Sequence, residues 1–289
     1  MAPVRSLLGK ARPPLPSQTI VITGASDGIG AAAARRLTAD GNTVVLVGRS
    51  PEKTAAVADE LGLKYHVADF AELDQVRRLA DELLTEHPTI DVLANNAGGI
   101  MGHRQETVDG FELTFQVNHL APFLLTNLLL PTLVESRAKV IQTSSIAARL
   151  FGHLDLDDLG LERGYSPDRA YGNAKLANIL FTRELDTRYG DQGIAAAAFH
   201  PGVVGTNFAS DTTHPMRFLY QTPVVRNLFT ISPQRGARGL VWLAQNEPRT
   251  RWPTGEYFQH NRVARSNPQA RDAELARGLW DRSAGLLGL

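Results

Sequence analysis

Short apolar and β-branched runs alternate with longer helical patterns from residue 19 onward. Turn residues bound each run, and helices of roughly 12 or more residues fit between most of them. Six runs are predicted strands and a seventh is a candidate last strand: Thr19–Thr23, Thr43–Val47, Lys64–Val67, Ile90–Ala94, Lys139–Thr143, Ile194–Phe199 and Gly255–Phe258. This alternation predicts an α/β fold, a doubly wound parallel sheet covered by helices on both faces.

The 289 residues suit one large α/β domain, and neither a break in composition nor an internal repeat indicates a second. Residues 1–17 contain four prolines and three basic residues, so we expect a flexible N-terminal arm before a domain over 18–289. The arm lacks the apolar core of a secretory signal. No later stretch approaches the ~20 apolar residues of a transmembrane segment.

Composition excludes several classes of function. Basic and acidic residues balance at 30 each, so no net field favours nucleic acid. The absence of cysteine excludes disulfides, thiolate catalysis and cysteine-ligated metals, and it is consistent with a cytoplasmic protein. Five histidines show no ligand spacing, and we therefore predict no metal site: His103, His119, His153, His200 and His214.

Two long connections interrupt the alternation, at residues 149–168 and 203–231. Each follows a predicted strand, and ligands of open α/β sheets bind beyond the carboxyl ends of strands. Loops of this length are usually functional or disordered. The second is rich in Phe, Met, Leu and Tyr, so we expect it to form a substrate lid.

A glycine-rich turn, Thr23-Gly-Ala-Ser-Asp-Gly-Ile-Gly30, joins the first strand to an alanine-rich helix. Glycines allow a tight turn and close approach of the backbone to a pyrophosphate, and the helix N-terminus supplies oriented N–H groups. The spacing is G-x-x-x-G-x-G, not the usual dinucleotide G-x-G-x-x-G. Because such clusters are often only turns, its place between strand and helix is what favours a phosphate site.

The end of the second strand indicates which nucleotide is bound. A carboxylate there would bond the ribose 2′-hydroxyl of NAD, but this chain has Arg49, which can pair with the 2′-phosphate of NADP. A solvated surface arginine is the alternative. Position 27 is Asp rather than a second basic residue, so selectivity for NADP could be incomplete.

Further polar residues follow the third and fourth strands. Asp69 could contact adenine or could cap the helix that begins near Glu72. The small residues of Asn95-Asn-Ala-Gly98 suit a cofactor lying close against the backbone.

Tyr171 and Lys175 are four residues apart in a predicted helix, so both side chains share one face. A nearby ammonium group favours the phenolate and lowers the pKa of a tyrosine, which suits proton transfer near neutral pH. Such a pair alone is more often a solvated helix face, and it gains meaning from the other motifs.

Together the motifs resemble the short-chain dehydrogenase/reductase family of the classical type over about residues 18–260. They are Thr23-Gly-x3-Gly-x-Gly30, Asn95-Asn-Ala-Gly98, Asn118, Ser144-Ser145, Tyr171-x3-Lys175 and Pro201-Gly202. The chain looks most like the retinol-dehydrogenase-like branch, through Phe115–Leu120, Tyr171–Asn178 and the long insert. Anthracycline-type ketoreductases of polyketide pathways are similar too. The resemblance implies a single-domain, Rossmann-like fold.

The resemblance also implies roles for individual residues. Tyr171 would be the proton donor, and Lys175 would lower its pKa and hold the nicotinamide ribose. Ser145 would bond the substrate oxygen, and Asn118 would anchor a water that links Lys175 to solvent. The implied cofactor contacts include both Tyr171 and Lys175 and, along the chain, Thr23, Gly24, Ser26, Asp27, Gly28, Ile29, Gly30, Arg49, Asp69, Phe70, Asn95, Ala97, Gly98, Pro201, Gly202, Val204 and Thr206.

Each role has an alternative. Ser145 could cap a turn, Ser144 could be the active serine instead, and Asn118 could satisfy only backbone groups. Tyr165 is a weaker candidate than Tyr171 because Arg169, not Lys, lies four residues on. The interval of 26 residues from Ser145 to Tyr171 is about twice the family's usual one. If the insert displaces the strand end, the serine assignment fails.

The sequence therefore predicts an NADPH-dependent reductase of a lipophilic ketone or aldehyde, reversible as an alcohol dehydrogenase. A polyketide ketone, a retinoid or steroid, and a long-chain aldehyde all remain open as substrates, and a homo-oligomer is open too. A non-catalytic NADP sensor of the same fold is a rival, although a pure binder would not need Tyr171. A sugar-nucleotide epimerase is another rival, but the roughly 30 residues after Gly255 leave little room for its usual substrate domain.

Overall fold

An eight-stranded sheet forms the centre of the molecule in a computed structural model that describes residues 17–202 and 231–289. The strand order is β3-β2-β1-β4-β5-β6-β7-β8, and all neighbours are parallel except β7 and β8. The strands are β1 Thr19–Thr23, β2 Thr43–Gly48, β3 Tyr65–Val67, β4 Val92–Asn95, β5 Lys139–Thr143, β6 Ala195–His200, β7 Glu256–Gln259 and β8 Arg262–Val263. The predicted α/β fold is confirmed.

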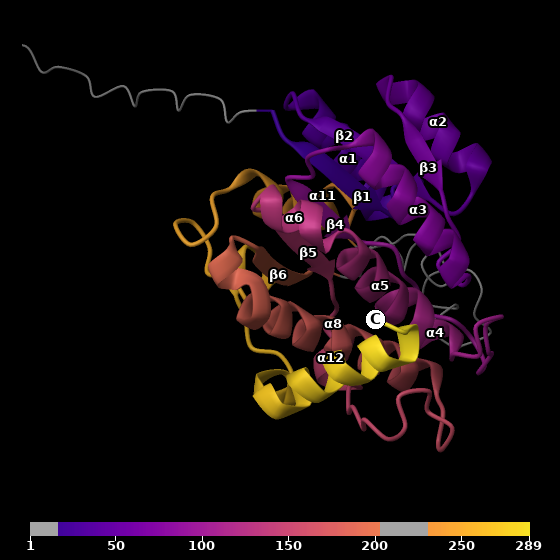
Figure 1. Ribbon diagram of the computed structural model, residues 1–289. Coiled ribbons are helices and arrows are strands. Elements are labelled where there is room, and N and C mark those ends of the chain that lie inside the picture. Colours follow the sequence, from indigo (N-terminus) through magenta and orange to yellow (C-terminus); the bar gives the residue numbers. More distant parts are fainter. Residues whose placement is uncertain (1–16, 203–230) are drawn as a thin grey trace, which may run out of the picture.

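Helices cover both faces of this sheet (Figure 1). One core lies under α1 Gly28–Ala39, α2 Pro51–Leu61 and α11 Pro233–Gln245. The opposite core lies under α3 Leu73–Glu86, α5 Ala121–Leu128, α8 Pro167–Tyr189 and α12 Ala273–Leu287. Strands buried on both faces read as nearly continuous apolar runs, which explains the sequence pattern.

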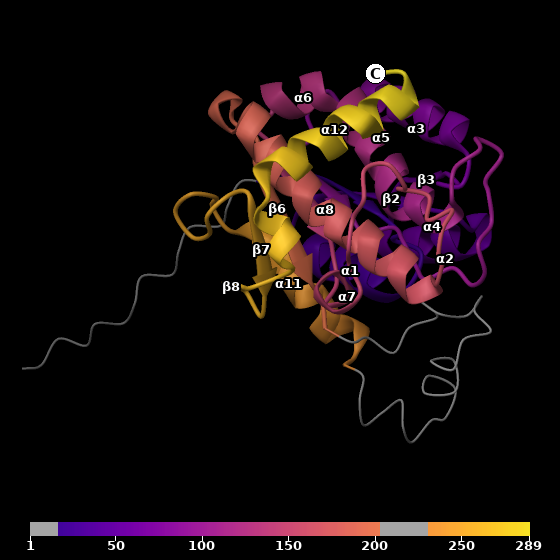
Figure 2. The same cartoon turned by 90° about the horizontal axis from the view of Figure 1, so that it is seen from below.

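Shorter elements complete the chain, and Figure 2 shows how α12 crosses α8 on the second face. They are α4 Leu113–Phe115, the π-helical turn η1 Gln116–Leu120, α6 Leu130–Glu135, α7 Ala147–Leu150 and the 3₁₀ turns η2 Gly190–Gln192 and η4 Pro268–Arg271. The apolar stretch over residues 121–130 is divided between α5 and the first residue of α6. Within the described ranges, no helix is both long and apolar enough to span a bilayer.

The order of the strands determines where a ligand can bind. The chain builds outward from β1 to β3, then returns to place β4 on the other side of β1. At such a switch point the loops after β1 and β4 diverge and leave a crevice beyond the carboxyl ends of the strands. The predicted glycine turn and the Asn95–Gly98 segment are these two loops.

Candidate active site

The long helix α8 carries Tyr171 and Lys175. Ser166 caps its N-terminus by accepting a hydrogen bond from the N–H of Arg169 at 3.2 Å, and Pro167 takes the first position, where its missing N–H costs nothing. The lysine Nζ lies 5.4 Å from the centroid of the Tyr171 ring. The prediction that the two side chains share one face is confirmed, and both are buried rather than solvated.

Lys175 is held inside the protein at the end of β5. Its Nζ donates to the carbonyl of Thr143 at 3.1 Å, and the side chain is only 2% exposed. Burial lowers the pKa of Lys175 to about 7, because a desolvated ammonium is disfavoured. Such a lysine responds strongly to any charge that binds beside it.

The two serines after β5 have different surroundings. The buried Ser144 hydroxyl donates to the backbone carbonyl of Lys175 at 2.8 Å and so ties α8 to the strand end. Ser145 is half-buried, and its Oγ accepts from the N–H of Ala147 at 3.2 Å. The hydroxyl of Ser144 is therefore used by the backbone of α8. The Ser145 oxygen accepts a hydrogen bond within a turn, which agrees with the alternative that Ser145 caps a turn.

The long insert leaves this strand end undisturbed. β5 ends at Thr143 as predicted, and α7 packs along α8 directly afterwards. The insert then leaves the end of β5 and returns to the start of α8. The N–H of His153 in the insert donates to Asn173 Oδ1 at 2.7 Å and so holds the insert against α8. The insert is thus an excursion, and the condition under which the Ser145 assignment would fail is not met.

Gly98 marks the point where Asn118 and Lys175 come together. A Cβ at Gly98 would overlap Asn118 Oδ1 and would lie 3.1 Å from Lys175 Nζ. The Asn118 side chain accepts from the N–H of Gly99 at 3.1 Å and donates to its carbonyl and to that of Thr114, both at 2.9 Å. Asn118 lies in the π-helical turn η1, and its amide is used by backbone groups, as the alternative reading allowed.

Asn96 was missed as a site residue, although it lies inside the motif that the sequence singled out. Its Nδ2 donates to the carbonyls of Thr23 and Gly24 at 3.0 and 3.3 Å, and its Oδ1 accepts from Thr143 at 3.2 Å. The Thr23 hydroxyl in turn accepts from the N–H groups of Asn96 and Ala97, both at 3.0 Å. These bonds join the loops after β1, β4 and β5 into one edge.

The glycine turn packs tightly against that edge. A Cβ at Gly24 would lie 2.8 Å from the Cα of Ala97, and one at Gly30 would collide with the carbonyl of Gly24. The Asp27 carboxylate accepts from the N–H of Gly28 at 2.6 Å and caps α1. The half-buried Ile29 packs on the core beneath. Only glycine fits these two crowded positions, which leaves the helix N-terminus open to an anion.

Arg49 extends from the neighbouring strand end. It is exposed, and it makes no hydrogen bond or ion pair with any residue that the structure describes. A Cβ at Gly48 would lie 3.0 Å from Ser26 Cβ, so the strand end adjoins the glycine turn. The next residue, Ser50, caps α2 by accepting from the N–H of Lys53. An uncommitted guanidinium thus stands beside a helix N-terminus, and both attract an anion.

Three predicted contacts have other structural uses. Asp69 accepts from the N–H of Ala71 at 2.9 Å, and Glu72 occupies the N-cap position of α3, so the capping alternative for Asp69 is wrong and its contact with adenine stays a prediction. Phe70 is buried in the apolar core. Asn95 is 3% exposed, and its Nδ2 donates to Thr126 at 2.9 Å, beneath the sheet edge.

The sequence model described as short chain dehydrogenase matches residues 18–217. The chain belongs to the short-chain dehydrogenase family. A Streptomyces sp. (strain C5) protein provisionally assigned as a daunorubicin C-13 ketoreductase is 42% identical, over 95% of this chain and 94% of its own. Human retinol dehydrogenase 13 is 38% identical, over 95% and 86%. This is the retinol-dehydrogenase-like branch predicted from the motifs, and the chain is an oxidoreductase.

Solved structures agree with this short-chain dehydrogenase assignment. An uncharacterized protein from Mycobacterium paratuberculosis matches with a TM-score of 0.75 and 35% identity, covering 95% of this chain and 96% of the other. A short chain dehydrogenase from Escherichia coli CFT073, complexed with NADPH, matches with a TM-score of 0.64 and 26% identity, covering 85% and 97%. The family uses a nicotinamide cofactor, and the glycine-lined crevice fits one.

The remaining predictions for this short-chain dehydrogenase concern the end of β6. Pro201 and Gly202 follow the strand directly and are half-buried, and Gly202 has a positive φ of 96°. Val204 and Thr206 lie outside the described residues, as does the predicted lid except for its last residue, Ile231. The predicted arm also lies outside them, except for its last residue, Ser17.

Tyr165 does not resemble a proton donor. Its hydroxyl lies 3.2 Å from the carbonyl of Gly102 and 3.4 Å from a carboxylate oxygen of Glu112. Burial, together with the Glu112 carboxylate, raises the pKa of Tyr165 to about 12. Tyr171 is therefore the better candidate of the two.

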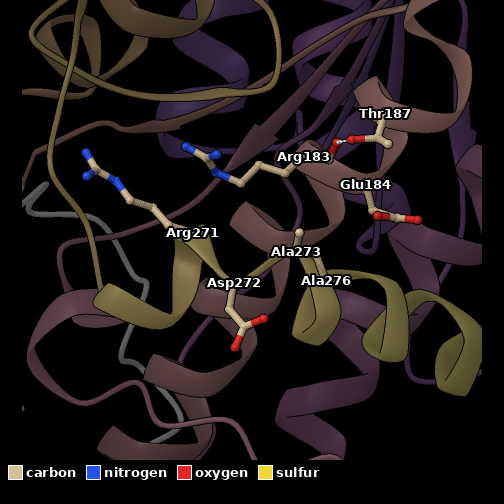
Figure 3. A pocket seen from close by; sticks show the side chains of 7 residues that line it. All are labelled: Arg183, Glu184, Thr187, Arg271, Asp272, Ala273 and Ala276. Carbon is tan, nitrogen blue, oxygen red and sulfur yellow. Dashed lines mark hydrogen bonds between the residues drawn. The ribbon is translucent and has the colours of Figure 1, made fainter.

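A shallow hollow at the other end of α8 is separate from this site (Figure 3). Three of its four charged groups have partners within the protein: Arg183 pairs with Glu256, Glu184 pairs with Arg188, and Asp272 caps α12, while Arg271 is the fourth. It lies three turns along the helix from Tyr171 and lacks a comparable set of proton-transfer groups.

Proposed function

We propose that this short-chain dehydrogenase reduces a lipophilic ketone or aldehyde to an alcohol with NADPH, and catalyses the reverse oxidation when NADP⁺ is supplied. The observation that carries the proposal is Lys175, buried at the carboxyl edge of the sheet with its ammonium group 5.4 Å from the Tyr171 ring. A solvated helix face would leave both side chains in water. A protein that only senses NADP would gain nothing from burying this pair.

Tyr171 donates a proton to the carbonyl oxygen in reduction and accepts one in oxidation. Lys175 favours the phenolate when it is charged, and because burial lowers its pKa to about 7, its charge at neutral pH depends on what binds beside it. Negative charge of a bound dinucleotide raises the charged fraction, which makes the proton donor most effective in the loaded enzyme.

Ser145 supplies a hydroxyl for the substrate oxygen, so that charge developing there is stabilised. Asn118 holds Gly99 and thereby keeps the bare backbone of Gly98 beside Lys175. When bound, the nicotinamide supplies the hydride. Residues that would hold the cofactor are the glycine turn over 23–30, Arg49, the backbone of Ala97 and Gly98, and Lys175.

NADPH is favoured over NADH by Arg49, which is exposed, uncommitted and beside the N-terminus of α2. The structural relative from Escherichia coli CFT073 is complexed with NADPH. A lipophilic substrate is supported by the names of the two sequence relatives, a daunorubicin C-13 ketoreductase and a retinol dehydrogenase. A polycyclic ketone and a retinoid are therefore the first compounds to test, followed by steroids and long-chain aldehydes.

The proton-transfer role is tested with Tyr171→Phe, which removes only the hydroxyl. We expect NADPH oxidation in the presence of substrate to fall at least about 1000-fold, within the range for loss of acid–base catalysis. NADPH affinity, followed by nicotinamide fluorescence, should change by no more than a few-fold. Turnover close to the parent rate would refute the assignment, whereas inactivity combined with lost NADPH binding would indicate misfolding instead.

The role of Arg49 is tested with Arg49→Ala. Losing a charge-assisted contact with the 2′-phosphate should raise the KM for NADPH about 10- to 100-fold, and the KM for NADH less than about threefold. Arg35→Ala is the control, because Arg35 in α1 is also exposed but pairs with Glu60 in α2. Equal losses for both cofactors in Arg49→Ala would show that this side chain does not read the 2′-phosphate.

A further inference from the structure

Three side chains that the oxidoreductase chemistry does not use lie together where α3 ends near β3, the first strand in the order of the sheet. Figure 1 shows the ribbons of α3 and β3. The three side chains are His66 in β3, and Glu86 and His87 at the C-terminal end of α3. One potential ligand atom of each lies within 4.8 Å of the others. In the sequence, 20 residues separate the first two, so no ligand spacing announces the cluster.

His66 is arranged as metal-binding histidines usually are. Its ring is 6% exposed, and its Nδ1 lies 2.9 Å from a carboxylate oxygen of Glu82. That oxygen accepts from Nδ1–H, so in the neutral ring Nε2 is the nitrogen that keeps a lone pair. Nε2 is buried and has no hydrogen-bond partner within residues 17–202 and 231–289. A carboxylate that fixes the tautomer from behind is a common partner of a metal-ligating histidine.

His87 offers a second nitrogen of the same kind. Its Nε2 is also buried and has no hydrogen-bond partner in the part of the chain that the structure describes, and the two imidazole centroids lie 6.4 Å apart. Two unpaired, buried nitrogen atoms in one place are unusual, because buried polar atoms nearly always have partners.

We propose that His66, Glu86 and His87 bind a divalent transition-metal ion of the zinc class. Two imidazoles and one carboxylate are a common zinc ligand set, in which a water completes a tetrahedron. Ligand atoms about 2.0–2.1 Å from zinc lie about 3.4 Å apart. The present ligand atoms lie within 4.8 Å of one another, so their separations need to shrink by up to about 1.4 Å. The exposed Glu86 has the freedom to make most of that movement.

Lys64 competes for the carboxylate. Its Nζ lies 3.2 Å from Glu86 Oε2, and its side chain is 79% exposed, so it can turn into water when an ion binds. The site is a structural one in this proposal: it joins the C-terminal end of α3 to the edge strand β3, and its three ligands are not among the residues around Tyr171 and Lys175. Bound metal would fasten the end of α3 to β3 without touching the reacting groups.

The test uses tag-free, full-length protein in a non-chelating buffer, with Zn²⁺ as the probe for calorimetry and Co²⁺ for visible absorption. We expect one equivalent of Zn²⁺ to bind with a Kd at or below about 10 μM and to raise the melting temperature. Co²⁺ should give the intense visible bands of a four-coordinate ion. Reductase activity should change less than twofold.

His66→Gln and His87→Gln should each weaken Zn²⁺ binding at least about 30-fold, whereas His103→Gln, at an exposed histidine outside the cluster, should leave it unchanged. Lys64→Gln should tighten binding several-fold. No saturable Zn²⁺ binding by the parent protein would overturn the proposal, as would unchanged affinity in both histidine variants. The Zn²⁺ titration of the parent protein tests the proposal by itself. The proposal therefore stays falsifiable even if a histidine variant does not fold.

Discussion

The missing side chain at Gly98 is what allows Asn118 and Lys175 to approach one point. Its φ is 152°, a value that L-residues with side chains rarely adopt, and a Cβ there would overlap Asn118 Oδ1. The residue is thus required twice, by backbone conformation and by space. Sequence reasoning found it through the motif, but the motif alone did not reveal what the glycine touches.

Gly98→Ala should therefore disturb the ammonium group rather than the fold as a whole. We expect kcat/KM to fall at least about 100-fold, because a displacement of about 1 Å near the reacting groups is enough for such a loss. Gly285→Ala is the matched control: that glycine lies in α12 with no neighbour within 4 Å of a new Cβ. Steady-state kinetics on both variants checks this, and near-parent activity in Gly98→Ala would contradict the geometry.

At the scale of elements, a buried polar chain links η1, α8 and α12. His119 Nδ1 lies 3.4 Å from Asn178 Oδ1, and His119 Nε2 lies 3.0 Å from Ser283 Oγ. Asn178 Nδ2 reaches the carbonyl of Thr143 at 3.4 Å, the same oxygen that Lys175 uses at 3.1 Å. The C-terminal helix is therefore connected to the helix that carries Tyr171 by specific bonds as well as by packing.

Ser283→Ala should weaken that connection. With Asn178 accepting from Nδ1, the Nε2 atom of His119 needs a donor, and its loss leaves a buried acceptor unpaired at a cost of about 1–3 kcal/mol. Urea unfolding at pH 7 measures the difference in the free energy of unfolding. Gly285→Ala, two residues away on the same helix, should not destabilise, and an equal effect of both changes would argue against a specific hydrogen bond.

The elements that the sequence predicted best are those with local signals. The bounds of β1 and β5 are as predicted, because each is a short apolar run ended by turn residues. The alanine-rich helix after the glycine turn starts at Gly28, so the last two glycines of the motif already belong to its first turn. β8 was missed: two exposed residues, Arg262 and Val263, pair only with β7 and leave no periodicity to read.

The contacts that assemble the site were less accessible to sequence reasoning. Asn96 bridges three loops that are far apart in the chain, and no local pattern separates its role from that of Asn95. The grouping of His66 with His87 depends on how α3 returns along the sheet. Residue types at the site could be predicted, whereas their partners required the fold.

For the molecule as a whole, two histidines are buried in neutral form. His119 and His200 are 1% and 8% exposed, and burial lowers the pKa of each to about 4. In the unfolded chain a histidine titrates near 6.5. Between these pH values the unfolded chain binds protons that the folded chain does not. The contribution of the two neutral histidines to the free energy of unfolding is therefore complete above pH 6.5 and is lost as the pH falls toward 4.

Urea unfolding between pH 7 and pH 5 checks this directly. A complete shift of this size corresponds to about 3 kcal/mol per histidine, so the loss should be well advanced at pH 5. His119→Gln should flatten the dependence, even if it lowers stability at every pH, whereas the exposed His103→Gln should leave it unchanged. A parent protein equally stable at pH 7 and pH 5 would contradict neutral burial.

The helix α8 is at once a rigid part of the core and the carrier of the phenol and the ammonium group. Substitutions that reshape it would disturb the core and the reaction together, so neither can change alone. The segments around the first turn of α8 are not subject to both of these constraints. Substrate specificity can therefore change in evolution through changes in the surrounding loops, while the reaction itself is retained.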